Sequence, residues 1–342
     1  MEASANARPI RVLQPFGAIL RTTNPYIAML HQALQQTPGV ETLTFSYGRA
    51  LRGGYDVVHM HWPETRLGGR TASRRAVRLL LAYLYVLRLR VFRIPIVRTM
   101  HNLELPSGLS RLDYGFLRLV ERWTTLHILL NETTPPTGRP SVTILHGHYR
   151  TWFSPYPPQE PTVGRLGYAG LVRRYKNIVG LLTAFGAARE RDPSLTLVVA
   201  GMPSGDRLEG EIRAAAGDGV ELDFRFLDDP DLVQVVTSSE LVVLPYRHMH
   251  NSGTVLLALS LDRPVLVPAN AANEALSDEV GPGWVLVFDG ELDGPRLLDA
   301  VEDARAPRSD RPDLSRREWA DAGSAHLDAY RHAIALRASR SA

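Results

Sequence analysis

The chain has 342 residues, of which 44% are apolar, 22% charged and 8% aromatic. This composition is globular and the length suits two hydrophobic cores, which excludes a mainly disordered, collagen-like or coiled-coil protein. The absence of cysteine excludes disulfides, thiolate metal sites and a cysteine nucleophile. The net charge of +3 is uneven, because residues 1–155 carry +11 and residues 156–342 carry −8. We therefore expect an anionic partner near the first half.

No targeting or membrane-spanning segment is predicted. Residues 1–11 lack the apolar core of a secretion signal. No uncharged apolar run approaches the roughly 20 residues that cross a bilayer. We therefore expect a cytoplasmic location.

The first half alternates strand and helix patterns. Helices are predicted at 25–35, 74–92 and 112–124, and strands at 10–16, 40–45, 55–62, 94–100, 127–130 and 141–145. Strands that alternate with helices indicate a parallel sheet covered on both faces.

The alternation restarts after residues 153–161, where four prolines predict a linker. Helices follow at 177–189, 206–216, 230–238 and 254–261, and strands at 165–168, 195–200, 220–226, 241–245, 264–268 and 284–288. A terminal helical pair is predicted over 314–338. The sequence thus predicts two facing, doubly wound α/β domains, 1–155 and 156–342, whose terminal helices could cross back to the first. Ligands of such sheets bind at the carboxyl ends of the strands.

Two segments of the second half suit a phosphate. Ser252, Gly253 and Thr254 open an apolar helix, whose free backbone N–H groups and partial positive charge attract anions. The alternative is a simple N-cap. Gly170 follows a strand and precedes Arg173 and Lys176, the only lysine of the chain. Fixed cations there would stabilise a leaving diphosphate.

The order of these motifs resembles the donor domain of GT-B glycosyltransferases over about residues 165–270. The resemblance rests on Gly170 to Lys176, an apolar strand ending in Ala200-Gly201, a strand ending at Pro245 and a strand over 262–265. In the first half, the stretches 23–26, 56–64 and 98–102 are similar to bacterial GDP-mannose:glycolipid β-mannosyltransferases of exopolysaccharide synthesis. The resemblance implies a nucleotide-diphosphate sugar as substrate, no separate cofactor, and a donor site that also includes Tyr246.

One departure from the wider superfamily concerns the mechanism. Many retaining members carry two glutamates around the phosphate helix, and the corresponding positions here are about Met249 and Leu257. Their replacement favours an inverting transferase, which needs a general base to deprotonate the acceptor hydroxyl. The alternatives are a retaining enzyme with another donor and a catalytically silent nucleotide-binding partner of another transferase.

The candidate base lies in the first half. His59, His61 and Glu64 follow one predicted strand, and period two places His59 and His61 on one face with Met60 and Trp62 on the other. Glu64 or His61 is the predicted base, while His59 alone reads as a hydrogen-bonded core residue. His101 matches a family histidine that contacts the donor sugar. Further candidates for the acceptor or the cleft are Asn24, Asn102, Glu104 and His148.

The sequence favours a metal-independent enzyme. Three His-x-His pairs, at 59/61, 146/148 and 248/250, have a spacing that can bind metal, but no acidic pair accompanies them. A metal-dependent hydrolase is therefore the weaker alternative. Asp229-Pro-Asp231 is interpreted as a helix start with favourable carboxylates rather than a metal motif.

Residues 66–98 contain nine arginines and no acidic residue, and enclose nine uncharged residues over 79–87. This segment is either a buried helix or a basic-flanked helix that rests on an anionic membrane surface. No nucleic-acid recognition motif is present, so no nucleic acid is expected. We expect peripheral contact with the inner face of the plasma membrane and a lipid-linked glycan acceptor.

Overall fold

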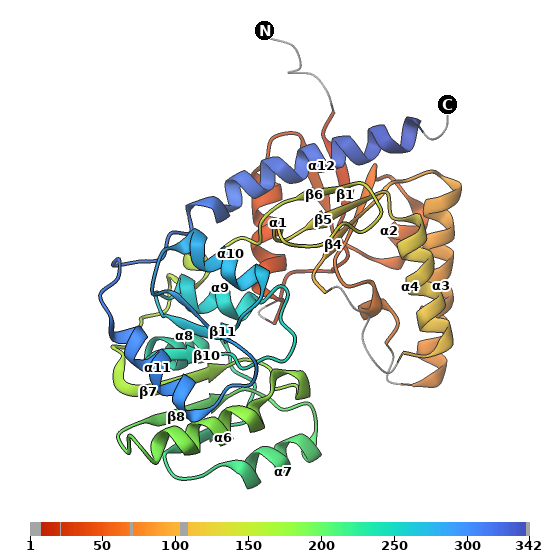
Figure 1. Ribbon diagram of the computed structural model, residues 1–342. Coiled ribbons are helices and arrows are strands. Elements are labelled where there is room, and N and C mark those ends of the chain that lie inside the picture. The colour runs from red at the N-terminus through yellow and green to blue at the C-terminus, as the bar shows by residue number, and fades with distance from the viewer. Residues whose placement is uncertain (1–7, 21, 69–70, 103–108, 340–342) are drawn as a thin grey trace. The chain divides into compact units, whose positions relative to one another are not determined.

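The computed structural model describes residues 8–20, 22–68, 71–102 and 109–339 (Figure 1). The chain divides into two compact units. Unit 1 consists of Met1–Gly147 and Arg317–Ala342, and unit 2 of His148–Arg316.

Unit 1 contains a six-stranded parallel sheet of order β2-β1-β3-β4-β5-β6. The order reverses between β1 and β3, so this pair is the switch point at which doubly wound sheets bind ligands. The strands are β1 (Ile10–Leu13), β2 (Val40–Leu43), β3 (Val57–Met60), β4 (Ile96–Met100), β5 (Leu126–Leu129) and β6 (Ser141–Thr143).

Helices cover both faces of this sheet. On one face α1 (Pro25–Gln36) packs beside α12 (Trp319–Ser339), which also contacts β3, β4 and β5. On the other face lie α2 (Tyr47–Arg52), α3 (Ala72–Val91), α4 (Arg111–Trp123) and the short helix η1 (Pro63–Arg66) (Figure 1).

Successive side chains of β3 point to opposite faces of the sheet. Val58 and Met60 join the apolar cluster under α3 and α4. His59 points the other way and bonds Tyr330 on α12. The prediction that His59 and His61 share a face opposite Met60 is therefore confirmed, whereas the placement of Trp62 is wrong. The strand ends at Met60, and the Trp62 ring stacks on His101 at a centroid distance of 3.9 Å.

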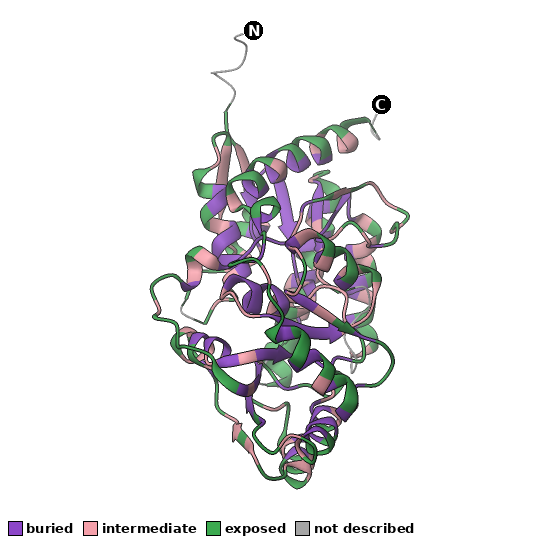
Figure 2. Cartoon of the chain, turned by 60° about the vertical axis from the view of Figure 1, so that its left-hand side comes forward, coloured by how far each residue is buried: buried purple, intermediate pink, exposed green. Residues whose placement is uncertain are grey.

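Unit 2 contains a second six-stranded parallel sheet, of order β12-β11-β10-β7-β8-β9. Its switch point is the pair β7 and β10. The strands are β7 (Thr162–Ala169), β8 (Thr196–Ala200), β9 (Val220–Asp223), β10 (Ser239–Val243), β11 (Val265–Pro268) and β12 (Val285–Phe288). Most residues of the central strands are buried, as helix cover on both faces requires (Figure 2).

The helices of unit 2 connect these strands. They are α5 (Arg150–Phe153), η2 (Arg174–Lys176), α6 (Ile178–Arg189), α7 (Asp206–Ala215), α8 (Asp229–Thr237), α9 (Gly253–Ser260), α10 (Ala271–Val280), α11 (Gly294–Arg305) and η3 (Ser315–Arg317), whose last residue belongs to unit 1. The terminal helical pair expected over 314–338 is instead η3 and the single helix α12.

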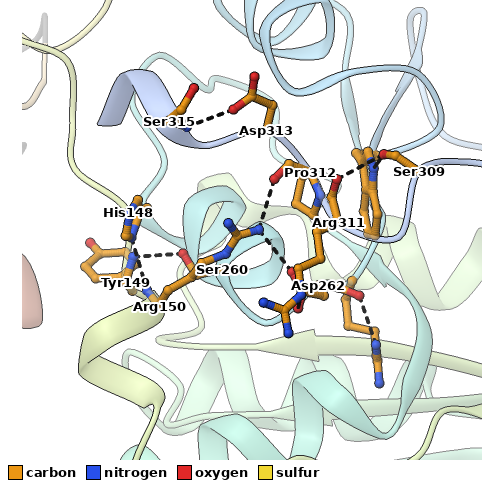
Figure 3. A network of polar contacts seen from close by, with 12 residues as sticks. His148, Tyr149, Arg150, Ser260, Asp262, Ser309, Arg311, Pro312, Asp313 and Ser315 are labelled. Atoms are coloured by element: carbon orange, nitrogen blue, oxygen red, sulfur yellow. Dashed lines mark hydrogen bonds and ion pairs between the residues drawn. The ribbon is translucent and has the colours of Figure 1, made fainter. Parts of the chain in front are cut away.

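The division between the units lies at Gly147/His148 rather than at the proline-rich stretch 153–161. The backbone N–H of Tyr149 donates to Ser260 Oγ at 2.8 Å. The Arg150 guanidinium bonds Asp262 and the carbonyl of Pro312 (Figure 3). These contacts fix the segment before the prolines to unit 2, so the prolines lie within that unit and do not separate two domains.

Among the residues that the structure describes, none of the helices combines the length and apolar character needed to cross a bilayer.

Candidate functional sites in the two units

The first candidate site lies in unit 2, after β7 and β10. The chain leaves β7 through Gly170, whose φ is +127°, a conformation that L side chains rarely adopt. A Cβ at Gly170 would lie 3.9 Å from Nζ of Lys176 and 3.9 Å from Oγ1 of Thr254. The ammonium and the hydroxyl therefore converge on the open space beside this glycine.

Lys176 is unusual because its cationic side chain is buried, with 8% of the residue exposed. Nζ lies 4.9 Å from the ring centroid of Tyr246 and 5.7 Å from that of Tyr168. Burial lowers the pKa of Lys176 to about 8. A bound anion would stabilise the charged form of this ammonium, which burial disfavours.

The start of α9 completes this candidate site. Ser252 is the N-cap of the helix, yet its side chain makes no capping hydrogen bond, so the N-cap alternative does not account for this hydroxyl. The Tyr246 hydroxyl lies 3.5 Å from Thr254 Oγ1, and burial raises its pKa to about 12. Gly253 is the first helical residue, so no side chain stands beside the free N–H groups at the start of the helix.

Two arginines near Lys176 differ in their surroundings. Arg174 pairs with Glu211 at 2.8 Å. Arg173 is exposed, and within the described part of the chain the structure records no ion pair for it. The positive charge of Arg173 acts on Lys176, whereas Arg174 is already neutralised by Glu211.

Met249 and Leu257, which stand where many retaining relatives carry glutamates, make structural contacts here. Leu257 is 8% exposed and packs within unit 2. The Met249 carbonyl accepts a hydrogen bond from Asn270 Nδ2 at 3.2 Å, and its sulfur lies 3.3 Å from Asn273 Nδ2. Asn270 and Asn273, at the start of α10, were not singled out from the sequence because the helix that carries them was not predicted.

A second candidate site lies in unit 1, just after β3 and β4. Nδ1 of His61 and Nε2 of His101 are 3.1 Å apart, so one ring donates a hydrogen bond to the other. Both rings pack edge-on to Tyr26, at centroid distances of 5.7 and 5.1 Å. Nε2 of His61 is buried without a hydrogen-bond partner. Tyr26 ends the stretch 23–26 on which part of the family resemblance rests, but its contact with the two histidines was not predicted from the sequence.

The electrostatics separate the two candidate bases. Burial lowers the pKa of His61 and of His101 well below the ordinary value, and each is lowered further by a neighbouring histidine. Both rings are therefore neutral near pH 7 and poor proton acceptors. Burial raises the pKa of Glu64, on η1, which improves this carboxylate as a base near neutral pH.

The remaining candidates are dispersed. His59 bonds Tyr330 at 2.9 Å and Thr99 at 2.7 Å, and is the core residue that was expected. Asn24 caps α1 by accepting from the Tyr26 N–H. Asn102 is exposed after β4, and His148 is buried at the start of unit 2. Glu104 lies outside the described residues.

The His-x-His pairs raised the question of a metal site. Among the described residues, no group of three or more His, Asp or Glu side chains is placed to hold an ion. Ring nitrogens of these histidines are engaged in other hydrogen bonds. His59 bonds Tyr330 and Thr99, His61 bonds His101, and His146 Nδ1 donates to the Gly147 carbonyl.

Two doubly wound units, each with polar residues at the carboxyl ends of its strands, are the architecture of the GT-B fold, to which many glycosyltransferases belong. The structure of Anabaena HepE in complex with UDP-glucose covers 96% of this chain and 98% of its own, with a TM-score of 0.58 and 12% identity. A glycosyltransferase involved in avilamycin A biosynthesis matches with a TM-score of 0.57 at 14% identity, over 96% of this chain and 98% of its own. At such identities the likeness concerns the fold.

The sequence comparisons specify the family. A family model described as glycosyl transferases group 1 matches residues 162–303. A GDP-mannose:glycolipid 4-beta-D-mannosyltransferase from Xanthomonas campestris pv. campestris is 38% identical over 315 residues, which cover 91% of this chain and 89% of the relative. The chain belongs to the same glycosyltransferase family as this enzyme, and the family prediction from the sequence is confirmed.

Proposed function

We propose that the protein transfers mannose from GDP-mannose to a lipid-linked glycan acceptor, in the synthesis of a cell-surface polysaccharide. The printed activity of the 38% identical relative supports this donor and a glycolipid acceptor. The observation that carries the proposal is the buried ammonium of Lys176, which borders the same open space beside Gly170 as Thr254 Oγ1.

In this proposal unit 2 holds the donor diphosphate. Lys176 and Arg173 supply positive charge, while the N–H groups and hydroxyls from Ser252 to Thr254 donate hydrogen bonds. The nucleotide diphosphate gains negative charge as the sugar departs, and fixed cations stabilise that charge in the transition state. We therefore propose that these side chains, rather than a metal ion, balance the leaving group.

Glu64 is proposed as the general base of an inverting transfer. GDP-mannose carries its sugar in the α configuration, and the relative is named for a β-mannosyl product, which together imply inversion at the anomeric carbon. Inversion in one displacement requires a base on the acceptor hydroxyl. The neutral pair of His61 and His101 would serve as hydrogen-bond donors and acceptors to the sugars.

We also propose that unit 1 rests on an anionic membrane surface. The outer face of α3 exposes an apolar stripe at helical spacing, with Val77 57%, Leu80 59%, Leu84 43%, Leu87 51% and Val91 65% exposed. Arginines flank this stripe along the helix. A helix with an exposed apolar stripe and basic flanks binds at the bilayer interface. The structure thereby favours the surface helix over the wholly buried helix that the sequence left open.

The test of the donor is thermal stability in the presence of GDP, GDP-mannose, UDP and UDP-glucose. A ligand that binds only the folded state raises the melting temperature. A rise with GDP and GDP-mannose alone supports the proposal, and selection of the UDP ligands contradicts the donor. NMR assignment of the anomeric configuration of the mannosyl product, formed on a glycolipid acceptor, then distinguishes inversion from retention.

A further inference from the structure

Unit 1 has a pocket of about 840 Å³ that none of the site residues above explains, apart from Asn102 on its lining. It lies against β4, β5, α4 and the loop at 135–139. Its lining includes the arginines Arg98, Arg118, Arg122 and Arg139, the carboxylate of Glu121 and the ring of His127.

The pocket holds more positive charge than its own carboxylate can balance. Glu121 is shared by Arg98 at 2.5 Å, Arg139 at 3.2 Å and the His127 ring at 3.4 Å. The Arg98 side chain is only 12% exposed, and its Nε is buried without a hydrogen-bond partner. Buried cations are unfavourable unless they are paired, so a group with more than one negative charge would complement this lining.

The surroundings of the pocket indicate what carries that negative charge. Tyr114 lines the pocket and is 46% exposed, and Leu112, on the same helix, is 61% exposed. Their helix, α4, packs beside α3, which carries the exposed apolar stripe. A basic pocket next to an apolar surface suits an amphiphile with an anionic head and hydrocarbon chains.

The pocket is also close to the proposed base. The helix α4 packs against η1, which carries Glu64. The positive charge of Arg98 acts on Glu64 and on His101. Arg98 points to one face of β4 and Thr99 to the other, where Thr99 bonds His59, so the pocket and the histidines lie on opposite faces of one strand.

We propose that this pocket binds the diphosphate of the lipid-linked acceptor, with Arg98, Arg118 and Arg122 as its ligands. The inference rests on the proposed function, because it names the group by which that acceptor is held. A diphosphate diester carries two negative charges and suits an excess of arginines better than a phosphodiester headgroup with one. Arginine forks bind such oxygens in pairs.

The experiment measures binding to vesicles without any donor nucleotide. Phosphatidylcholine vesicles contain either farnesyl methyl diphosphate, a diester with two negative charges, or farnesyl methyl phosphate, a diester with one, and bound protein is measured by cosedimentation. Lys176→Met serves as the background for all variants, since it removes the diphosphate ligand of unit 2. The double variant Arg118→Gln, Arg122→Gln alters the pocket. The matched control, Arg90→Gln with Arg111→Gln, removes two exposed arginines of α3 and α4 that do not line it.

The expected result is a preference of about tenfold or more for the diphosphate vesicles, lost in the pocket variant and kept in the control. Equal binding to both lipids, or equal loss in both double variants, would overturn the proposal in favour of general membrane charge. Competition by inorganic pyrophosphate at the same concentration as the lipid would overturn the lipid as the source. A failure here is distinct from a failure of the proposed function, which GDP-induced stabilisation of the unaltered protein decides.

Discussion

Replacing Lys176 by methionine should stabilise the free protein while abolishing donor binding. Burial moves the pKa of Lys176 from 10.5 to about 8, so the folded chain holds a charge at pH 7 that its surroundings disfavour. Keeping that charge costs up to about 3 kcal/mol of unfolding free energy. Loss of the contacts with the Tyr246 and Tyr168 rings offsets roughly 1 kcal/mol or more of this gain. We expect a net stabilisation of about 1–2 kcal/mol.

The measurement is urea unfolding of both proteins across the pH range. The pKa is lowered on folding, so the cost is fully present below pH 8 and disappears as the pH rises from about 8 towards 10.5. The stability difference between variant and wild type should therefore shrink over that interval. The control is Arg174→Met, which removes an exposed cation paired with Glu211 and should change stability by less than about 1 kcal/mol.

Two results would refute this reasoning about Lys176. A variant that is less stable than the wild type at pH 7 would show that the ammonium is satisfied within the folded chain. A variant that still gains stability with GDP would show that the diphosphate lies elsewhere. A variant that gains stability but loses donor binding shows that Lys176 serves binding. If the lysine had a structural role, its replacement would lower both the stability of the protein and its donor binding.

Three further outcomes are expected. Donor affinity, followed by titration calorimetry, should fall as the pH rises through about 8, since Lys176 must then take up a proton to bind the diphosphate; a flat profile contradicts this assignment. Glu64→Gln should lower kcat by about 10²–10⁴ with little change in GDP-induced stabilisation, and an unaltered turnover would exclude this base. Acid should destabilise unit 1, because burial lowers the pKa of His146 and of His326 to about 4. Above pH 6.5 both rings are neutral in the folded and unfolded chain, so they carry no cost. By pH 5 each should lower the free energy of unfolding by on the order of 2 kcal/mol, which hydrogen exchange of unit 1 would measure.

Much of the fold could be read from the sequence because its strands are short apolar runs between recognisable turns. The helices α10 and α11 were missed for local reasons. The first begins in a run of alanine and asparagine, and the second begins with Gly294-Pro295, neither of which gives a strong apolar period. Tertiary packing, not local pattern, forms these helices.

Part of the site could be predicted because some of its residues lie close together in the sequence. Residues that follow one strand, such as Gly170, Arg173 and Lys176, form a local pattern visible in one stretch of sequence. The basic pocket of unit 1 was not visible in this way. It depends on the register in which Arg98 of β4 lies opposite His127 of β5, and on the loop that brings Arg139 to Glu121. Such pairings join residues far apart in the chain, and no single segment signals them.

The position of α12 has a consequence for how the protein is made. Unit 2 is one continuous stretch, and the chain can complete it while later residues are still being synthesised. Unit 1 is discontinuous, because Tyr330 and His326 fill its core from the far end of the sequence. Until α12 emerges from the ribosome, His59 has no Tyr330 hydroxyl to bond, and β3, β4 and β5 lack the helix that packs on them. Unit 2 can therefore fold before unit 1, although most of unit 1 is translated first. The N-terminal part of unit 1 stays incompletely folded for longest during synthesis and is the part most exposed to chaperones.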